Sequence, residues 1–177
     1  MRSHDFPILP STKVASLLDR YPQLEEILIG LAPPFKKLRN PLLRKGVAKV
    51  ASLKQAAAVG GMAVEDLVNK LRAAVGQEAI TSEDAGKSIS YFSDQPEWFT
   101  SSKVVISIDE SAVDQDSMPI VVVLRKAARL RPGEMLELVT TFLPAPGIAI
   151  MKRKGLRVWS VQQGPELIRT YVSKASD

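Results

Sequence analysis

The chain has 177 residues, of which 45% are hydrophobic and 24% charged, so it can bury substantial cores and resembles neither a disordered tail nor a membrane protein. It contains no cysteine, which excludes disulfides, thiolate catalysis, iron–sulfur ligation and persulfide carriage, and its one histidine, His4, cannot form a metal site alone. The net charge of +5 lies in the first half: residues 1–80 carry 12 lysines and arginines against 7 acids, and residues 81–177 carry 12 against 12.

No segment of the chain has the length and apolarity of a signal-peptide core or a membrane span. The longest apolar run, Pro119 to Leu124, is far shorter than the roughly 20 residues that a helix needs to cross a bilayer. We therefore expect a folded, cytoplasmic protein with no membrane partner.

The first 76 residues are predicted to form an all-helical bundle of about five short helices. Ser11 or Thr12 can cap the first helix, and Ser52 can cap the fourth. Tyr21-Pro22 separates the first two helices. Apolar residues recur at helical spacing in all five: Val14, Leu17 and Leu18; Leu24, Ile27, Leu28 and Leu31; Leu42, Leu43, Val47 and Val50; Leu53, Ala56 and Val59; Leu67, Val68, Leu71 and Val75.

Between the second and third helices lies a basic stretch with three prolines, residues 33–44, which we call the basic elbow. Asn40 before Pro41 predicts a helix start, because the amide side chain can accept from an early backbone N–H and the proline brings a preset φ. No acidic residue lies between Glu26 and Glu65, so the elbow should attract anions. The residues that we expect to bind a partner protein or a small anion are Lys36, Lys37, Arg39, Asn40 and Arg44.

Arg44 has two distinct interpretations within the elbow. It lies one helical turn past Asn40, and its guanidinium can hold a carboxylate or phosphate group through two parallel hydrogen bonds. Alternatively, it braces the helical domain by bonding to loop carbonyls. A solvated cationic face is the plain alternative for the elbow as a whole.

Residues 54–68 have the small, glycine and apolar spacing of a helix-turn-helix, which makes DNA binding a second hypothesis. The same pattern fits any tight helix pair. The second helix begins with Val64, Glu65 and Asp66, whose two carboxylates would repel DNA phosphates where a recognition helix presents polar or basic groups. We therefore expect nucleic acid to be a less favoured partner.

Residues 77–103 are mostly polar, show no sustained period and are predicted to form a linker. Aromatic residues interrupt this polar stretch, which would be wasteful in a free linker. We predict that Trp98 or Phe99 docks onto one of the two domains.

Residues 104–177 are predicted to form a βαβαββ two-layer α/β sandwich with both helices on one face of the sheet. The expected elements are a strand at Val104–Ile108, a helix at Pro119–Leu130, a strand at Met135–Phe142, a helix at Pro144–Lys154, and hairpin strands at Leu156–Val161 and Leu167–Val172.

This second domain offers one candidate cleft and one acidic loop. The start of the helix at Pro146 provides backbone N–H groups, and Met118 and Phe142 could line an apolar cleft beside it for a small acidic ligand. The alternative is that these residues belong to the core and a turn. The acidic loop could hold a hard cation, but its spacing matches no known calcium loop and a solvated loop is the alternative. Its acids are Asp109, Glu110, Asp114 and Asp116.

Several segments of the first domain match a family pattern: Thr12-Lys13-Val14, Leu17-Leu18, Tyr21-Pro22, Phe35, Leu38, Asn40-Pro41-Leu42, Arg44, Val47-Ala48, residues 52–57 and Leu67-Val68. They resemble a small helical bacterial domain of unknown function, the 1858 type, which occurs alone or beside redox and hemerythrin-like modules. Many members have a cysteine pair near the end of the second helix, where this chain has Gly30-Leu31-Ala32-Pro33. The resemblance therefore implies a thiol-free branch without redox chemistry.

The second domain matches another pattern: Leu124 to Leu130, Pro132-Gly133-Glu134, Leu136, Leu138, residues 142–146, Ile148, Gly155 and the hairpin from Val158 to Val172. These residues resemble the sulfur-carrier fold of the TusA and SirA type, or its relative, the 2249-type domain of denitrification and hemerythrin-linked proteins. Sulfur carriers need a cysteine before the helix-opening proline, and Met118 stands there. A thioether cannot be deprotonated, so the resemblance implies the fold without sulfur transfer.

No serine, threonine or lysine has a visible base or orienting partner in the sequence, so we predict no catalytic site, cofactor or metal. We expect a non-catalytic, two-domain binding or regulatory protein that acts through a partner protein or a small anion. A link to anaerobic or nitrogen-oxide metabolism is implied by the resemblance only. The alternative is a DNA-binding regulator with a helix-turn-helix-like first domain and a ligand-sensing second domain.

Overall fold

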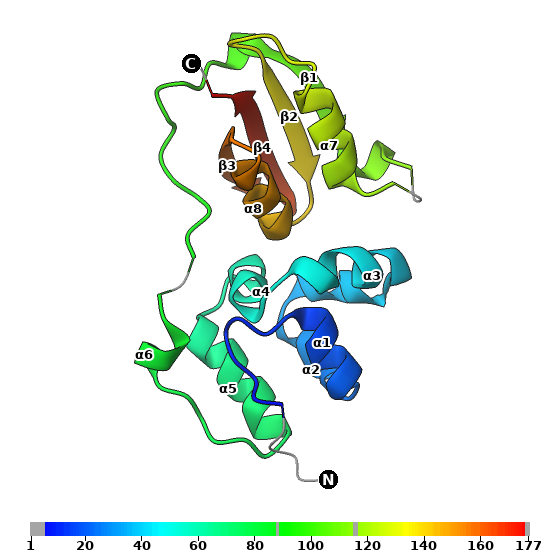
Figure 1. Cartoon of the computed structure of the whole chain (residues 1–177), viewed down its shortest axis with the longest axis vertical. Coiled ribbons are helices and arrows are strands. Elements are labelled where there is room, and N and C mark those ends of the chain that lie inside the picture. The colour runs from blue at the N-terminus through cyan, green and yellow to red at the C-terminus, as the bar shows by residue number, and fades with distance from the viewer. Residues whose placement is uncertain (1–5, 88, 115–116, 176–177) are drawn as a thin grey trace. The chain divides into compact units, whose positions relative to one another are not determined.

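The computed structural model describes residues 6–87, 89–114 and 117–175 (Figure 1). His4 and Asp116, both considered above, lie outside these ranges. The chain divides into two compact units, Met1–Ile89 and Ser90–Asp177. We call them the helical unit and the sheet unit and describe each by itself. The predicted linker, 77–103, is divided between them at residue 89.

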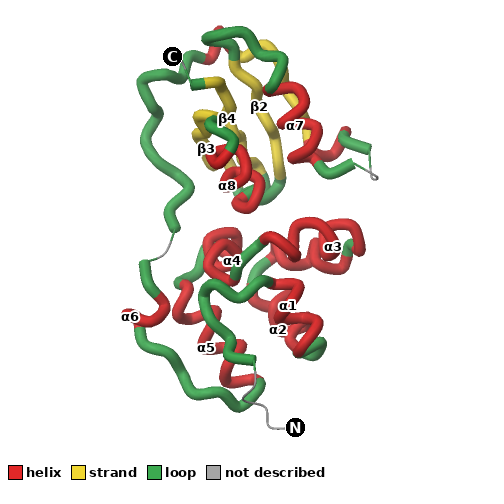
Figure 2. Tube along the Cα trace, viewed as in Figure 1, coloured by secondary structure: helices red, strands yellow, loops and turns green. Residues whose placement is uncertain are grey.

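The helical unit consists of short helices, as the spacing of its apolar residues indicates, and a long loop joins α5 to α6 (Figure 2). The elements are α1 Val14–Arg20, α2 Leu24–Leu31, the 3-10 helix η1 Pro33–Arg39, α3 Pro41–Val50, α4 Leu53–Gly60, α5 Val64–Ala74 and α6 Ser82–Ala85.

Local signals place some of these helices correctly. Helix α3 begins at Pro41 as expected, and Ser52 caps α4 through a capping box with Gln55. Two details differ from the prediction. Helix α1 is preceded by Lys13 rather than by Ser11 or Thr12. Thr81 forms a second capping box that starts α6, a helix that the polar composition of the segment concealed.

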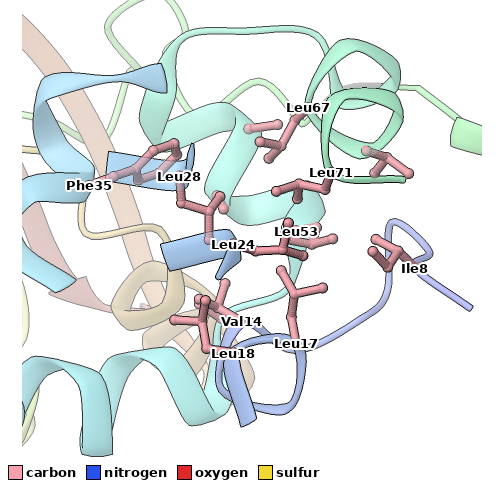
Figure 3. Packing of buried hydrophobic residues seen from close by; sticks show 14 of the residues in the cluster. Ile8, Val14, Leu17, Leu18, Leu24, Leu28, Phe35, Leu53, Leu67 and Leu71 are labelled. Carbon is pink, nitrogen blue, oxygen red and sulfur yellow. The ribbon is translucent and has the colours of Figure 1, made fainter. Parts of the chain in front are cut away.

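The core of the helical unit gathers side chains from α1, α2, α4 and α5 (Figure 3). Leu17, Leu24, Leu53 and Leu71 are completely buried in it. Phe35 anchors η1 to the same core, and a Cβ on Gly60 would stand only 3.0 Å from the Phe35 ring. The elbow is therefore a 3-10 helix fixed by an apolar anchor, which holds its charged residues in defined positions.

The segments that immediately precede α1 and α4 lie far apart in the chain but pair through their backbones. Lys13 and Ser52 form an isolated antiparallel bridge. The amide of Val14 donates to the Ala51 carbonyl at 2.9 Å, and the amide of Lys54 donates to the Pro10 carbonyl at 2.9 Å. This pairing sets the starts of the two helices side by side.

The sheet unit shows the βαβαββ order of elements that the sequence predicts, with a four-stranded mixed sheet. The elements are β1 Val104–Asp109, α7 Pro119–Ala127, β2 Met135–Thr140, α8 Ala145–Arg153, β3 Leu156–Gly164 and β4 Leu167–Lys174. The strand order is β1-β2-β4-β3, in which β1 is parallel to β2 and the other two pairs are antiparallel. Helix α7 packs against β2 and β4, and α8 packs against β3.

The segment before β1 lies against this sheet. The ring of Phe99 stands 4.7 Å from the Trp159 ring and 4.5 Å from the Tyr171 ring, measured between centroids. The guanidinium of Arg157 lies over Trp98 at 5.2 Å, and the indole of Trp159 donates to the Ser93 carbonyl at 3.0 Å. We expected Trp98 or Phe99 to dock onto one of the two domains, and both contact strands of the sheet: Phe99 contacts residues of β3 and β4, and Trp98 contacts a residue of β3.

Among the described residues, no helix is long and apolar enough to cross a membrane.

Candidate functional site

The two arginines of the basic elbow pair with acids from the first turn of α2. Arg44 Nη1 lies 2.7 Å from Glu25 Oε2, and Arg39 Nη2 lies 3.4 Å from Glu26 Oε2. Helix η1 follows α2 and packs against it, so the chain folds back on α2. Arg39 and Arg44 therefore meet acids that precede them by 13 and 19 residues, respectively. Arg44 thus bonds to a carboxylate of its own domain, rather than to the loop carbonyls considered above.

The lysines of the same region are differently placed. Lys36, Lys45 and Lys49 are exposed, and no carboxylate of the described chain forms an ion pair with them. Lys37 is half-buried and Asn40 is exposed. Within the described residues, Lys36, Lys45 and Lys49 therefore carry exposed charges without an ion pair, whereas the exposed Arg39 and the half-buried Arg44 each have a carboxylate partner.

Four lysines of the helical unit, which we call the lysine track, are Lys45 and Lys49 on α3, Lys13 directly before α1, and Lys54 in the first turn of α4. Lys45 and Lys49 are four residues apart on α3 and so share one face of the helix. Lys13 Nζ donates to the carbonyl of Val50 at 2.7 Å, which brings its ammonium to the C-terminal end of α3, beside Lys49. The backbone pairing described above then places Lys54 next to the Lys13 segment.

The helix-turn-helix-like pair is present as α4 and α5, but acids occupy the start of its second helix. Glu65 accepts a hydrogen bond from the Ser82 hydroxyl, and Asp66 is exposed. These two carboxylates lie in the first turn of α5, where a recognition helix meets phosphates.

The predicted cleft of the sheet unit is poor in donors. Met118 precedes α7 and is half-buried, Phe142 is half-buried, and Pro146 is buried in the first turn of α8. The amide of Ala145 donates to the Leu143 carbonyl at 2.9 Å and that of Ile148 to the Pro144 carbonyl at 2.9 Å. Because Pro146 has no N–H, at most one amide of this turn, that of Gly147, remains for an anion.

The sheet contains a buried polar network that the sequence did not predict. Glu137 Oε2 accepts from the Ser107 hydroxyl at 2.7 Å, and its Oε1 accepts from Arg169 Nη1 at 2.7 Å. Ser107, Glu137, Tyr171 and Trp159 are register partners across the four strands, so they share one face of the sheet. The signal in the sequence was Glu137, the one charged residue of β2.

The environment of Glu137 fixes its charge. Burial alone would raise the pKa of Glu137, but hydrogen bonds from Ser107, Arg169 and Tyr171 outweigh burial and hold this pKa below its ordinary value. Burial, together with the hydrogen bond to Glu137, raises the pKa of Tyr171. The network is therefore an ionised carboxylate with its partners in place, which suits a structural role.

The described acids of the loop, Asp109, Glu110 and Asp114, do not gather into a metal site. Asp109 accepts from the amide and the hydroxyl of Ser111 at 2.8 and 2.6 Å, and these hydrogen bonds lower the pKa of Asp109. Across the described ranges, no group of three or more histidine, cysteine or acidic side chains is placed to hold a metal ion.

The helical unit is thus a small domain packed around a leucine-rich core with a cationic surface. Residues 8–68, which run from the segment before α1 into α5, match the family model described as Domain of unknown function (DUF1858). This confirms the resemblance of the first domain at the level of the family match. Neither the curated proteins nor the solved structures include a significant match to the chain. The TusA-like arrangement of the sheet unit stays a prediction.

The ion pair of the elbow can be measured by a double-mutant cycle. We expect Arg44→Ala and Glu25→Ala to lower the stability of the helical unit, with a coupling free energy of about 0.5 to 1 kcal/mol, because the pair is only partly exposed. Thermal unfolding followed by far-UV circular dichroism gives these values. Tryptophan fluorescence controls for the other unit, because both tryptophans, Trp98 and Trp159, lie in the sheet unit. A coupling of zero would show that the pair does not brace the elbow.

The network of Glu137 predicts a pH dependence of the sheet unit. A carboxyl whose pKa is lower in the folded state stabilises the fold above its unfolded pKa, and this contribution is lost as the pH falls through the folded value. Glu137→Gln should therefore lower the free energy of unfolding by about 2 kcal/mol at pH 7 and by less in acid. Urea unfolding followed by tryptophan fluorescence between pH 7 and pH 3 measures both. The same loss at every pH would contradict the assignment.

Proposed function

We propose that this protein is a non-catalytic binding or regulatory protein that holds an acidic partner protein, or a small anion, on the lysine track of its helical unit. The observation that carries the proposal is the contrast between the elbow's arginines and the lysines. The half-buried Arg44 has a carboxylate partner at 2.7 Å and the exposed Arg39 has one at 3.4 Å, whereas Lys45 and Lys49 are exposed on one helix face and form no ion pair within the described residues. A cluster of like charges facing water attracts anions and speeds their association.

The proposed site is therefore the lysine track, whereas the sequence favours the basic elbow. Of the elbow residues, Lys36 keeps an exposed charge, while Arg44 is engaged in bracing η1 and α3 against α2. The binding surface in this proposal is centred on α3 and continues from its C-terminal end to Lys13.

A DNA-binding regulator is the second candidate, and the pair α4 and α5 with the surplus of lysines is its support. One observation favours the first candidate over it: Glu65 and Asp66 stand in the first turn of α5, where their carboxylates would repel DNA phosphates.

In this proposal the sheet unit is a TusA-like domain that has lost the sulfur chemistry of that fold. Met118 stands directly before Pro119, the first residue of α7, where a sulfur carrier has its cysteine. A thioether carries no persulfide, so the proposed role of this unit is binding or regulation without group transfer.

Reversing two charges tests the proposed surface. We expect the double variant Lys45→Glu and Lys49→Glu to weaken binding of fluorescein-labelled poly-L-glutamate at least tenfold in fluorescence anisotropy at low salt, because two attractive charges become repulsive. The exposed pair Lys152 and Lys154 of the sheet unit provides a control with the same change of net charge.

Equal losses of affinity for the test and control variants would show that net charge alone drives binding, and would reject the lysine track as the binding surface. A random 20-base-pair duplex serves as the competing ligand. If the duplex binds more tightly than poly-L-glutamate, with a steep dependence on salt, the DNA-binding candidate replaces the first.

A further inference from the structure

The lysine track ends in a groove of the helical unit with a volume of about 520 Å³. The residues that line it include Leu9, Pro10, Lys13, Ser52, Lys54 and Asp84. Neither the elbow hypothesis nor the helix-turn-helix hypothesis makes use of this groove.

Backbone hydrogen bonds join the two chain segments that contribute most of the residues lining the groove. The 10–14 and 51–54 segments exchange backbone hydrogen bonds of 2.9 Å across the bridge between Lys13 and Ser52. The side chain of Ser52 is fixed as the cap of α4, where it accepts from the Gln55 amide at 3.2 Å. A preformed groove does not need to be ordered when a ligand binds, which reduces the entropic cost of binding.

The lining combines cations with exposed apolar surface. Lys13 and Lys54 both line the groove, and the ammonium of Lys54 lies 3.8 Å from the place where a Cβ on Gly86 would stand. Leu9, which lines the groove, is 42% exposed. Charge and apolar area side by side fit a ligand that carries both carboxylates and apolar side chains.

One acid in the groove distinguishes a peptide from a nucleic acid. Asp84 also lines the groove, and its carboxylate is fixed by the Thr81 hydroxyl at 2.9 Å. A nucleic acid places a phosphate on every nucleotide and would bring one against this carboxylate. A peptide can place acidic residues at the lysines and an uncharged or basic residue at Asp84.

We infer that this groove binds an acidic peptide segment of a partner protein, with carboxylates on Lys13 and Lys54 and an apolar side chain on Leu9. The inference rests on the proposed function, because it names the chemistry of the partner and the place where the lysine track receives it. The carboxylates of the segment reach Lys49 and Lys45 when the segment extends past the groove along α3.

The test is a selection from a random dodecapeptide display library on the full-length protein. We expect enriched peptides to contain two or more acidic residues adjacent to a leucine, phenylalanine or other large apolar residue. A synthetic copy of an enriched peptide should lose at least tenfold in affinity for the Lys54→Glu variant. Lys54 is the second residue of α4, and the positive end of the helix dipole stabilises a carboxylate at that position, so this variant should fold.

Matched variants make each outcome decisive. Lys70→Glu changes the charge equally at an exposed position of α5 outside the groove lining and should bind the peptide as the natural protein does. Enrichment of basic or uncharged peptides, or an equal loss for Lys54→Glu and Lys70→Glu, would overturn the groove assignment. Loss of binding for the Lys45 and Lys49 reversals but not for Lys54→Glu would reject the groove and leave the proposed function standing. No loss for any of these reversals would reject both.

Discussion

The ion pairs between the start of α2 and the elbow decide which cations of the helical unit face solvent without a carboxylate. Glu25 and Glu26 of the first turn of α2 each form an ion pair with an arginine of the elbow. An arginine suits this role because its planar guanidinium pairs with a carboxylate in a defined geometry, whereas a lysine is a flexible point charge. The consequence is that Arg44 joins α3 to α2 through Glu25, whereas Lys45 and Lys49 of α3 face solvent and form no ion pair within the described residues.

The sheet unit shows the same principle in a buried setting. Glu137 is the one charged residue of β2, and its charge is acceptable only because Ser107, Arg169 and Tyr171 all bond to it. Beside this network, Phe99 packs on Trp159 and Tyr171. The polar and aromatic contacts together cover a face of the sheet that a two-layer sandwich would leave in water.

Sequence patterns were sufficient wherever the cause of a structure is local. The start of α3 at Pro41 and the cap at Ser52 follow from a few neighbouring residues. The ion pairs could not be predicted, because Arg44 and Glu25 are 19 residues apart and meet only through the reversal of the chain at η1. The network of Glu137 depends on the register between strands, which the hydrophobic pattern alone does not specify for polar residues. The groove could not be predicted either, because it forms where two segments that are far apart in the sequence pair within the helical unit.

The central claim is that the lysine track, rather than the arginines of the elbow, receives the partner. Titration of the isotope-labelled full chain with an acidic dodecapeptide, followed by amide chemical-shift changes in NMR spectra, tests this claim most directly. The account predicts the largest changes at Lys45, Lys49, Lys13 and Lys54 and small changes at Arg39 and Arg44. Largest changes at the elbow's arginines, or in the sheet unit, would contradict it.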